Sequence, residues 1–329
     1  MTSRPQRPVR AIFLGSGRFA QPALGRLAAH PSVDLAAVVT APPRPVGRHQ
    51  RELPTPIENQ ARELGLAVQT PVRMRDEGAI AAVVALKPDL LVLADYGRIV
   101  PPALLELRFG ALNLHPSLLP RHRGATPIPA AILAGDTETG VTLFRMDAGV
   151  DTGPIIAVER STLGAQDTAP AVEARLAITA AGVLARALDP WLDGEIIAEP
   201  QPSEGATLTR PLRRADGALD PRQPAAALER RVRAFQPWPG TFFEADDQRV
   251  VVLAASVAPS DADDELGRLV PDPAGLAVAT SDGRFVLLEL QPAGGRPMSG
   301  EAFLRGRPSI LGRSIVAPVG AAAGNAEPA

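Results

Sequence analysis

The chain has 329 residues, of which 45% are hydrophobic and 21% charged, with a formal net charge of −2. This composition is typical of a globular protein long enough for two domains. The balanced charge means that any contact with nucleic acid must use local basic patches. The absence of cysteine excludes disulfides, thiolate metal sites and cysteine nucleophiles, and no apolar run reaches the roughly 20 residues of a membrane span. We therefore expect a cytoplasmic protein that does not enter a membrane.

Strand-like and helix-like segments alternate through the first 204 residues. Short apolar runs predict strands at 9–14, 35–40, 67–69, 89–94, 110–114, 140–146 and 155–163. Helical spacing of apolar residues predicts helices at 19–27, 57–64, 76–86, 124–134 and 169–188. The Pro- and Arg-rich stretch 42–56 is typical of a long loop. The alternation predicts a doubly wound, mostly parallel α/β domain of Rossmann-like type, with its ligand site at the carboxyl ends of the strands.

The composition changes after residue 204. The polar stretch 205–222 carries Arg210, Arg213 and Arg214 among prolines and glycines and is interpreted as an interdomain linker. A helix is expected at 224–234, followed by strands at 241–257, 275–280 and 284–290. These segments predict a smaller, mainly β domain over 223–318, an OB-like barrel. The Ala/Gly-rich tail 319–329 is expected to be disordered.

A glycine-rich turn follows the first strand. The sequence from Gly15 to Ala20 matches G-x-G-x-x-A, the pattern of a dinucleotide-binding turn. The confirming acid should end the second strand, about 20 residues further on. That strand ends in Thr40, and Asp34 lies at its wrong end. The pattern therefore favours an anion-binding or structural turn over a nicotinamide-dependent dehydrogenase.

Two later loops combine an amide, an imidazole and carboxylates. Transfer of a formyl or acyl group to an amine needs donors for a developing oxyanion and an acceptor for the amine proton. Asn113 and His115 lie two apart at the end of a strand, so their side chains share one face. Asp151 is a candidate to stabilise the charged imidazole, and by spacing Asp147 is another. A structural role for these residues also fits, since Asn commonly caps turns.

The segments 113–124 and 151–153 resemble folate-dependent formyltransferases. That resemblance implies that Asn113, His115 and Asp151 are catalytic, with Asp151 preferred over Asp147. It implies 10-formyltetrahydrofolate as the formyl donor, a co-substrate rather than a tightly bound cofactor, and no metal. The residues implied to shape or flank the folate pocket are Tyr96, Gly97, Ser117, Leu118, Leu119, Pro120, Asp147 and Gly149.

The segments 135–142, 233–240, 290–294 and 297–298 are similar to the members of this family that formylate initiator methionyl-tRNA. Because they lie on both sides of the linker, the resemblance covers nearly the whole chain. Members that formylate glycinamide ribonucleotide have a single domain and would end near residue 205. Sugar-nucleotide formyltransferases share the core and a second domain and remain the alternative; a non-catalytic RNA-binding protein is a third reading. We expect a monomer.

Arginine carries nearly all of the positive charge, since Lys87 is the only lysine. The resemblance implies tRNA contacts for the arginines of the long loop and of the linker, with further basic residues on the next helix: Arg44, Arg48, Arg51, Arg210, Arg213, Arg214, Arg230, Arg231 and Arg233. Read from composition alone, the same residues are solvated surface. Asp95 stands where the family more often has an apolar residue. Trp238, between two prolines, is expected to be a packed corner rather than a stacking surface for RNA.

Overall fold

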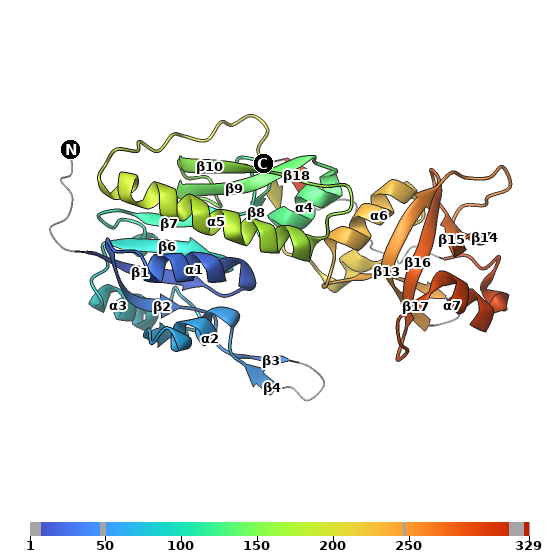
Figure 1. Ribbon diagram of the computed structural model, residues 1–329, viewed down its shortest axis with the longest axis horizontal. Helices are drawn as coiled ribbons and strands as arrows, with labels where there is room; N and C mark the ends of the chain where they lie inside the picture. Colours follow the sequence, from blue (N-terminus) through green and yellow to red (C-terminus); the bar gives the residue numbers. More distant parts are fainter. Residues whose placement is uncertain (1–7, 47–50, 246–247, 316–325, 329) are drawn as a thin grey trace.

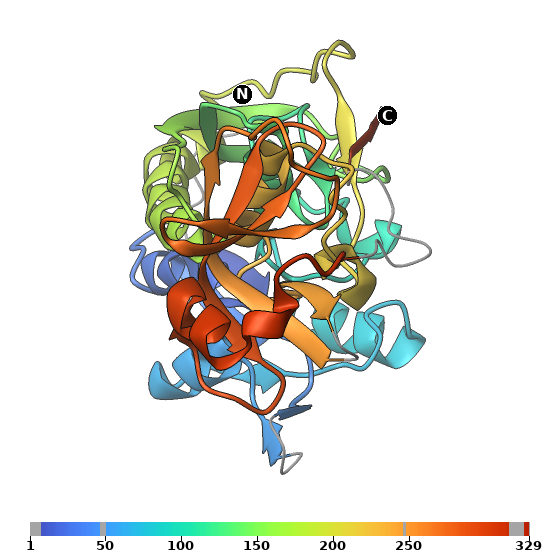
Figure 2. The same ribbon diagram turned by 90° about the vertical axis from the view of Figure 1, so that its right-hand side faces the viewer.

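The computed structural model describes residues 8–46, 51–245, 248–315 and 326–328. Two units lie side by side along the longest axis of the molecule, a larger α/β unit and a smaller β-rich one (Figure 1). Viewed from the end, the strands of the smaller unit and its terminal helix lie in front of the larger unit (Figure 2). No helix within the described ranges is long and apolar enough to cross a membrane.

A seven-stranded sheet in the order β10-β9-β7-β6-β1-β2-β5 forms the centre of the larger unit. Its strands are β1 (Val9–Gly15), β2 (Val33–Val39), β5 (Val68–Gln69), β6 (Leu90–Ala94), β7 (Ala111–His115), β9 (Glu138–Arg145) and β10 (Ile155–Thr162). Neighbours from β7 to β5 pair in parallel, whereas β9 runs antiparallel to β7 and β10 antiparallel to β9. The expected mostly parallel sheet is confirmed.

Helices cover both faces of this sheet, which explains why β6 is buried along its whole length. They are α1 (Gln21–Ala28), α2 (Pro56–Glu63), α3 (Glu77–Ala85), α4 (Pro127–Ala134) and α5 (Ala169–Leu192). The main hydrophobic core lies between the sheet and α1, α4 and α5, and a second core lies on the α3 face. Alternate residues of each strand enter opposite cores, so Leu112 and Leu114 of β7 face α5 while Ala111 faces α3.

The stretch expected as a long loop contains a short hairpin instead. Strands β3 (Arg44–Val46) and β4 (Arg51–Leu53) pair antiparallel, and the hairpin projects from the sheet (Figure 1). Pro and Arg dominate its composition, which hid the pairing from the sequence. Arg48 lies outside the described residues.

A small three-stranded sheet joins distant parts of the chain. It consists of β8 (Arg123–Gly124), β11 (Thr207–Thr209) and β18 (Ala326–Pro328) in the order β18-β11-β8. The helix expected from residue 124 therefore begins only at Pro127. Most of the tail expected to be disordered, 319–325 and 329, lies outside the described ranges; its described residues, Ala326–Pro328, pair with β11.

The second unit is mainly β, as expected. Its strands are β12 (Thr241–Ala245), β13 (Gln248–Ala258), β14 (Leu269–Asp272), β15 (Gly275–Ala279), β16 (Arg284–Pro292) and β17 (Met298–Ser299), with helices α6 (Ala225–Ala234) and α7 (Gly300–Gly306). The strand order is β12-β13-β16-β15-β14, with β17 on β16. Within the described residues no pairing joins the two edge strands β14 and β12, so this sheet is open between them. Side chains of α6 and α7 complete this unit's own core.

Candidate active site

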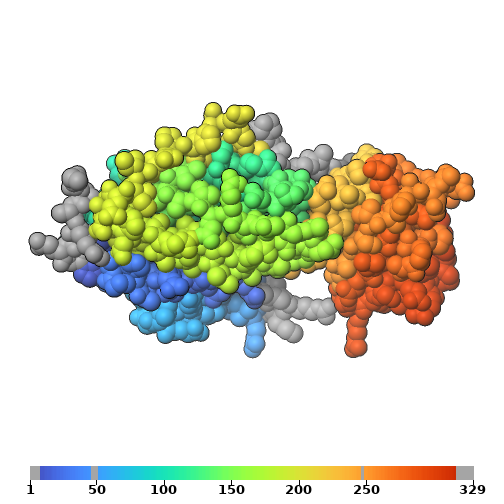
Figure 3. All heavy atoms as spheres, turned by 45° about the horizontal axis from the view of Figure 1, so that its top comes forward, coloured from blue at the N-terminus to red at the C-terminus, as the bar shows by residue number. Residues whose placement is uncertain are grey.

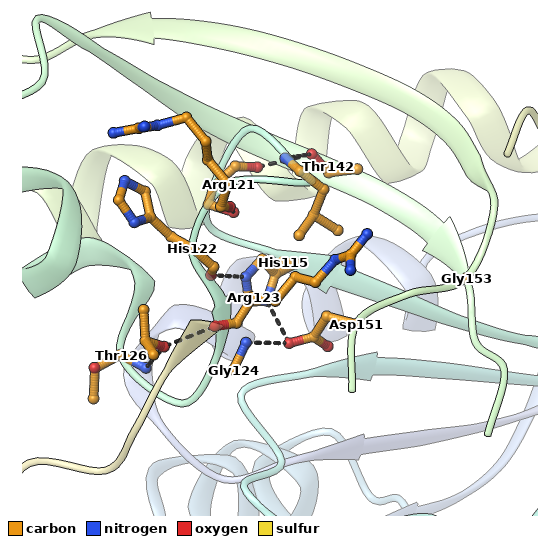
Figure 4. A network of polar contacts seen from close by, with 12 residues as sticks. His115, Arg121, His122, Arg123, Gly124, Thr126, Thr142, Asp151 and Gly153 are labelled. Carbon is orange, nitrogen blue, oxygen red and sulfur yellow. Dashed lines mark hydrogen bonds and ion pairs between the residues drawn. The ribbon is translucent and has the colours of Figure 1, made fainter. Parts of the chain in front are cut away.

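His115 ends β7 and is almost completely buried, with 5% of its surface exposed. Its Nε2 lies 2.9 Å from the carbonyl oxygen of His122, and its Nδ1 lies 3.6 Å from Oδ2 of Asp151 (Figure 4). Because a carbonyl oxygen can only accept, Nε2 must carry a proton. Nδ1 is therefore the nitrogen that can gain or lose a proton, and it faces a carboxylate.

Asp151 is fixed by contacts with both its side chain and its backbone. The Gly124 N–H donates to Oδ2 at 2.7 Å, and Gln201 Nε2 donates to the carbonyls of Asp151 and Gly153, each at 2.8 Å. The Gln201 oxygen in turn accepts from the Arg123 guanidinium at 2.8 Å. These contacts hold Asp151 at φ +53°, a conformation that residues other than glycine seldom adopt. Sequence reasoning missed Gln201, which lies 50 residues from Asp151 in an irregular segment.

Asn113 is half-buried in β7, two residues before His115. No other described residue forms a hydrogen bond with its side-chain amide, in contrast to the engaged side chains of His115 and Asp151. On the shared face of β7, this amide is therefore an available donor for a carbonyl oxygen of a ligand.

Asp147, the other candidate partner for His115, forms hydrogen bonds within its own loop instead. Its Oδ1 accepts from the Gly149 N–H at 3.0 Å and from the Thr152 hydroxyl at 2.6 Å. The side chain is exposed and closes the turn that leads to Asp151. A Cβ at Gly149 would lie 2.0 Å from the Thr152 hydroxyl oxygen, so a side chain there would displace the hydroxyl that donates to Asp147. Asp151, rather than Asp147, contacts His115.

The segment Ser117–Pro120 forms a rigid turn next to His115. Ser117 is fully buried, and its hydroxyl donates to the Arg121 carbonyl at 2.7 Å. Thr142 of β9 bridges the turn, since its hydroxyl donates to the Ser117 carbonyl and accepts from the Leu119 N–H. Leu118 and Pro120 are half-exposed, whereas Leu119 is buried. The Ser117 side chain therefore shapes the loop and offers no free hydroxyl to a ligand.

A cavity of about 430 Å³ lies beside this turn but outside the His115–Asp151 pair. It is lined by Leu118, Arg121, His122, Gly135, Asp136, Thr137, Glu138, Thr139 and Arg160. His122 Nε2 lies 2.7 Å from an Asp136 oxygen, and burial lowers the pKa of His122 despite that carboxylate. The neutral His122 thus donates to Asp136, and its own carbonyl holds His115.

The turn after β6 carries Tyr96 and Gly97. The Tyr96 ring is buried in the core on the α3 face, and its hydroxyl has no partner among the described residues. Burial raises the pKa of Tyr96, so the group is a neutral donor. Gly97 is exposed with φ +64°. This turn thus places one polar atom without a described partner inside an otherwise apolar core.

Asp95 closes the glycine-rich turn that follows β1. The Ser16 N–H donates to the Asp95 carbonyl at 3.0 Å, and a Cβ at Gly17 would lie 1.7 Å from Asp95 Oδ2. Although Asp95 is open to solvent on one side, desolvation raises its pKa to about 6; Glu173 adds to the rise and the Gly17 N–H opposes it. A carboxylate of the protein therefore occupies the place where a dinucleotide fold would hold phosphate.

The arginines expected to contact tRNA divide into two groups. Arg210 forms an ion pair with Asp216 at 2.7 Å, the buried Arg231 donates to the Asp216 carbonyl, and Arg230 and Arg233 donate to the carbonyls of Leu133 and Asp167. These four attach the linker and α6 to their surroundings. The second group is exposed and forms no ion pair with any described residue: Arg44, Arg51, Arg213 and Arg214.

Comparison with known proteins places this site in a family. Residues 9–188 match the family described as formyl transferase, and residues 211–308 match the formyl transferase C-terminal domain. The chain therefore belongs to the formyl transferases, as its sequence resemblance predicted.

Individual relatives cover almost the whole chain. A methionyl-tRNA formyltransferase of Halorhodospira halophila is 42% identical over 308 residues, covering 93% of this chain and 99% of the relative. One of a Roseiflexus species is 41% identical, covering 91% and 93%. Among solved structures, an N-formyltransferase from Helicobacter canadensis, in complex with folinic acid and dTDP-3-aminofucose, matches with a TM-score of 0.61 at 15% identity, covering 85% of this chain and 98% of that one. This last likeness shows the shared fold.

Proposed function

We propose that this protein transfers the formyl group of 10-formyltetrahydrofolate to the α-amine of methionine carried by initiator tRNA. The supporting observation is the approach of His115 Nδ1 to within 3.6 Å of Asp151 beside the unengaged amide of Asn113. All three groups lie at the carboxyl edge of the sheet, the expected position for a ligand. The methionyl-tRNA formyltransferase relatives, which align over more than nine tenths of this chain, favour tRNA over a sugar nucleotide.

The reaction forms one C–N bond and breaks another. The free amine of methionine attacks the formyl carbon, and the formyl oxygen becomes an oxyanion on a tetrahedral carbon. The Asn113 amide and the protonated His115 donate to that oxygen. Collapse breaks the bond between the formyl carbon and N10 of the folate, and the proton lost by the amine reaches N10. The products are the formylated amine and tetrahydrofolate.

Asp151 has two roles in this scheme. Because the His122 carbonyl holds Nε2, proton exchange with the site is limited to His115 Nδ1. The adjacent carboxylate stabilises the imidazolium as the oxyanion forms, and it assists removal of the amine proton. Its fixed position, set by Gly124 and Gln201, lowers the cost of reorganisation during the reaction.

The folate is proposed to lie between the turn after β6 and the loop that carries Asp147 and Asp151. Apolar walls with a few polar atoms suit a flat heteroaromatic ligand. The proposed contact residues are Tyr96, Gly97, Leu118, Leu119, Pro120 and Gly149, with Ser117 and Asp147 shaping the loops. The unpartnered Tyr96 hydroxyl supports this position.

The tRNA is proposed to bind across both units. The open guanidinium groups of Arg44, Arg51, Arg213 and Arg214 supply phosphate contacts, which give affinity without reading sequence. Arg48 would extend the same patch. Arg210 takes part through the backbone of the linker, since its side chain is paired with Asp216.

Labelled 10-formyltetrahydrofolate tests the function directly. Three acceptors are compared: methionine-charged initiator tRNA, methionine-charged elongator tRNA and a nucleotide-linked amino sugar. Transfer to the initiator tRNA alone supports the proposal. Transfer to the sugar alone would replace it with the sugar-nucleotide activity, and tight NAD(H) binding without any transfer would replace it with a dehydrogenase.

A further inference from the structure

The two tryptophans of this chain have opposite environments. Trp191, on α5, is half-buried and donates from Nε1 to the Phe109 carbonyl at 3.0 Å. Trp238 is 54% exposed, and no other described residue accepts from its Nε1. The packed corner expected for Trp238 is therefore not what the structure has. Neither core packing nor an internal hydrogen bond explains why the largest apolar side chain stands in solvent.

The turn that carries Trp238 is held firmly at the junction of the two units. Phe235, at its start, is buried in the core of the first unit, and the Gly240 N–H donates to the Phe235 carbonyl at 2.9 Å. The Gln236 side chain donates to the carbonyl of Leu253 in β13 of the second unit. In the space-filling view, the gold segment that includes α6 lies where the second unit meets the first (Figure 3). The exposed ring is thus presented on a braced support rather than on a free loop.

The same turn touches the linker. A Cβ at Gly217 would lie 2.0 Å from the Gly240 carbonyl oxygen, so the two backbones are in direct contact. Gly217 ends a short 3-10 helix that begins at Arg214. The exposed Arg213 and Arg214 therefore lie one short turn away from the contact that supports Trp238.

The other end of the linker touches the active site. Gly124, which donates to Asp151, pairs with Thr209 in the small sheet, and the Thr126 hydroxyl donates to the Arg210 carbonyl at 3.0 Å. A series of contacts between backbone segments thus runs from Asp151 to the linker arginines and then to the turn of Trp238. We call this series the path. The exposed arginines along this path, Arg213 and Arg214, form no ion pair with any described residue. The path ends at the exposed ring of Trp238.

We infer that this path binds the single-stranded 3′ end of the acylated RNA, with a base stacked on Trp238 and phosphates on Arg213 and Arg214. Proteins that bind single-stranded nucleic acid combine a basic track with aromatic platforms, and stacking accepts any base. The inference rests on the proposed function, because it assumes that the amine acceptor is attached to an RNA. It explains how an exposed tryptophan far along the chain contributes to binding at the His115–Asp151 site.

Kinetics of three variants test this role. For Trp238→Ala, loss of one stacked base predicts a KM for methionine-charged initiator tRNA about 5- to 150-fold higher, with kcat changed less than about threefold. Trp238→Phe keeps a ring and should recover most of the affinity. Leu266→Ala is the matched control, since Leu266 is also 54% exposed in the second unit; its KM should equal that of the parent. Equal KM values for Trp238→Ala and Leu266→Ala, with both variants folded by thermal melting, would overturn the inference.

Fluorescence separates this inference from the proposed function. The difference between the spectra of the parent and Trp238→Phe reports Trp238 apart from Trp191. Uncharged initiator tRNA should quench this difference signal, whereas the same tRNA without its four 3′-terminal nucleotides should not. Equal quenching by both RNAs would contradict stacking of the 3′ end. Because no formyl transfer is involved, quenching that depends on the 3′ end would stand even if the transfer assay failed.

Discussion

The turns that follow β1 and β7 both lie at the carboxyl edge of the central sheet, on either side of β6. Their polar groups, however, have different partners. After β1, the Gly15–Ala20 turn binds the protein's own Asp95, whose carboxylate sits against Gly17. After β7, the His115 imidazole faces Asp151 and the Asn113 amide has no partner among the described residues. In the first turn the Ser16 and Gly17 N–H groups both face Asp95, whereas the second turn keeps a side-chain donor without a partner among the described residues.

The comparison illustrates that the hydrogen-bond donors of a strand-end motif are available to a ligand only where neighbouring residues do not already bind them. A glycine-rich turn offers N–H groups to any anion, whether phosphate or carboxylate. Here Asp95, the residue that follows β6, supplies the carboxylate that lies against the turn after β1. On the β7 side, Gly124 and Gln201 fix Asp151 by hydrogen bonds that involve neither His115 Nδ1 nor the Asn113 amide.

The largest loss of kcat should come from removing the side chains of His115 or Asp151. We expect His115→Ala and Asp151→Ala to lower kcat by about 10²- to 10⁴-fold, because each removes a group that handles charge or a proton in the reaction. Asp147→Ala is the matched control from the same loop, since its carboxylate only closes a turn. Its kcat should stay within about tenfold of the parent in the formyl-transfer assay. Equal losses for Asp147→Ala and Asp151→Ala would contradict the assignment of roles.

Removing the unengaged donor should have the next largest effect. Asn113→Ala is expected to lower kcat by about 10²- to 10³-fold, the usual loss for one oxyanion donor. The KM values for both substrates should change little, because the donor acts mainly in the transition state. Asn113→Asp keeps the shape but replaces the donor with an acceptor, so it should be at least as severe. If Asn113→Asp retained parent activity in single-turnover measurements, the amide would not be a donor to the oxyanion.

Much of this arrangement could be predicted from the sequence. Continuous apolar runs such as Leu90–Ala94 predicted the buried strands, because helices on both faces demand that pattern. Asn113 and His115 were located by their place at a strand end. Residue spacing alone could not separate Asp151 from Asp147, since the choice depends on which carboxylate accepts the Gly124 N–H across 27 residues.

Other features depend on contacts that no local pattern records. Gln201 fixes Asp151 from an irregular segment, and Trp238 is exposed because the turn around it is braced by two separate units. The β3–β4 hairpin was hidden by the composition of the stretch 42–56, since Pro is depleted in strands. In each case tertiary contact, rather than periodicity, decides the structure.

The support of Asp151 predicts a smaller effect. Gln201→Leu removes both donors to the backbone around Asp151 and should lower kcat about tenfold, since displacement of a catalytic group by about 1 Å costs up to about 100-fold. Gln291→Leu is the control, because Gln291 also donates to a backbone carbonyl, that of Gly295, in the second unit. Steady-state kinetics should show no loss for it. Comparable kcat values for the two variants would mean that Gln201 does not position Asp151.

The closed turn predicts the smallest effect, on stability rather than on turnover. Folding raises the pKa of Asp95 from 3.8 to about 6, so the folded state binds more protons between these values and stability falls as pH rises through that range. In full, this would correspond to about 3 kcal/mol; because Asp95 is open to solvent, we expect about 1 kcal/mol. Asp95→Asn should therefore raise the free energy of unfolding by about 1 kcal/mol at pH 7 and above, with no gain near pH 4.

Urea unfolding from about pH 4 to pH 8 measures this difference. Glu173→Gln removes only the like-charge contribution to the Asp95 pKa, so it should give a smaller gain of the same sign. Asn still offers an oxygen to the Gly17 N–H, so the turn should keep its shape and formyl transfer its rate. A gain from Asp95→Asn that was equal at pH 4 and pH 7 would show that the carboxylate is not desolvated by the turn. The glycine-rich turn would then remain open to an outside anion, as its sequence pattern alone suggests.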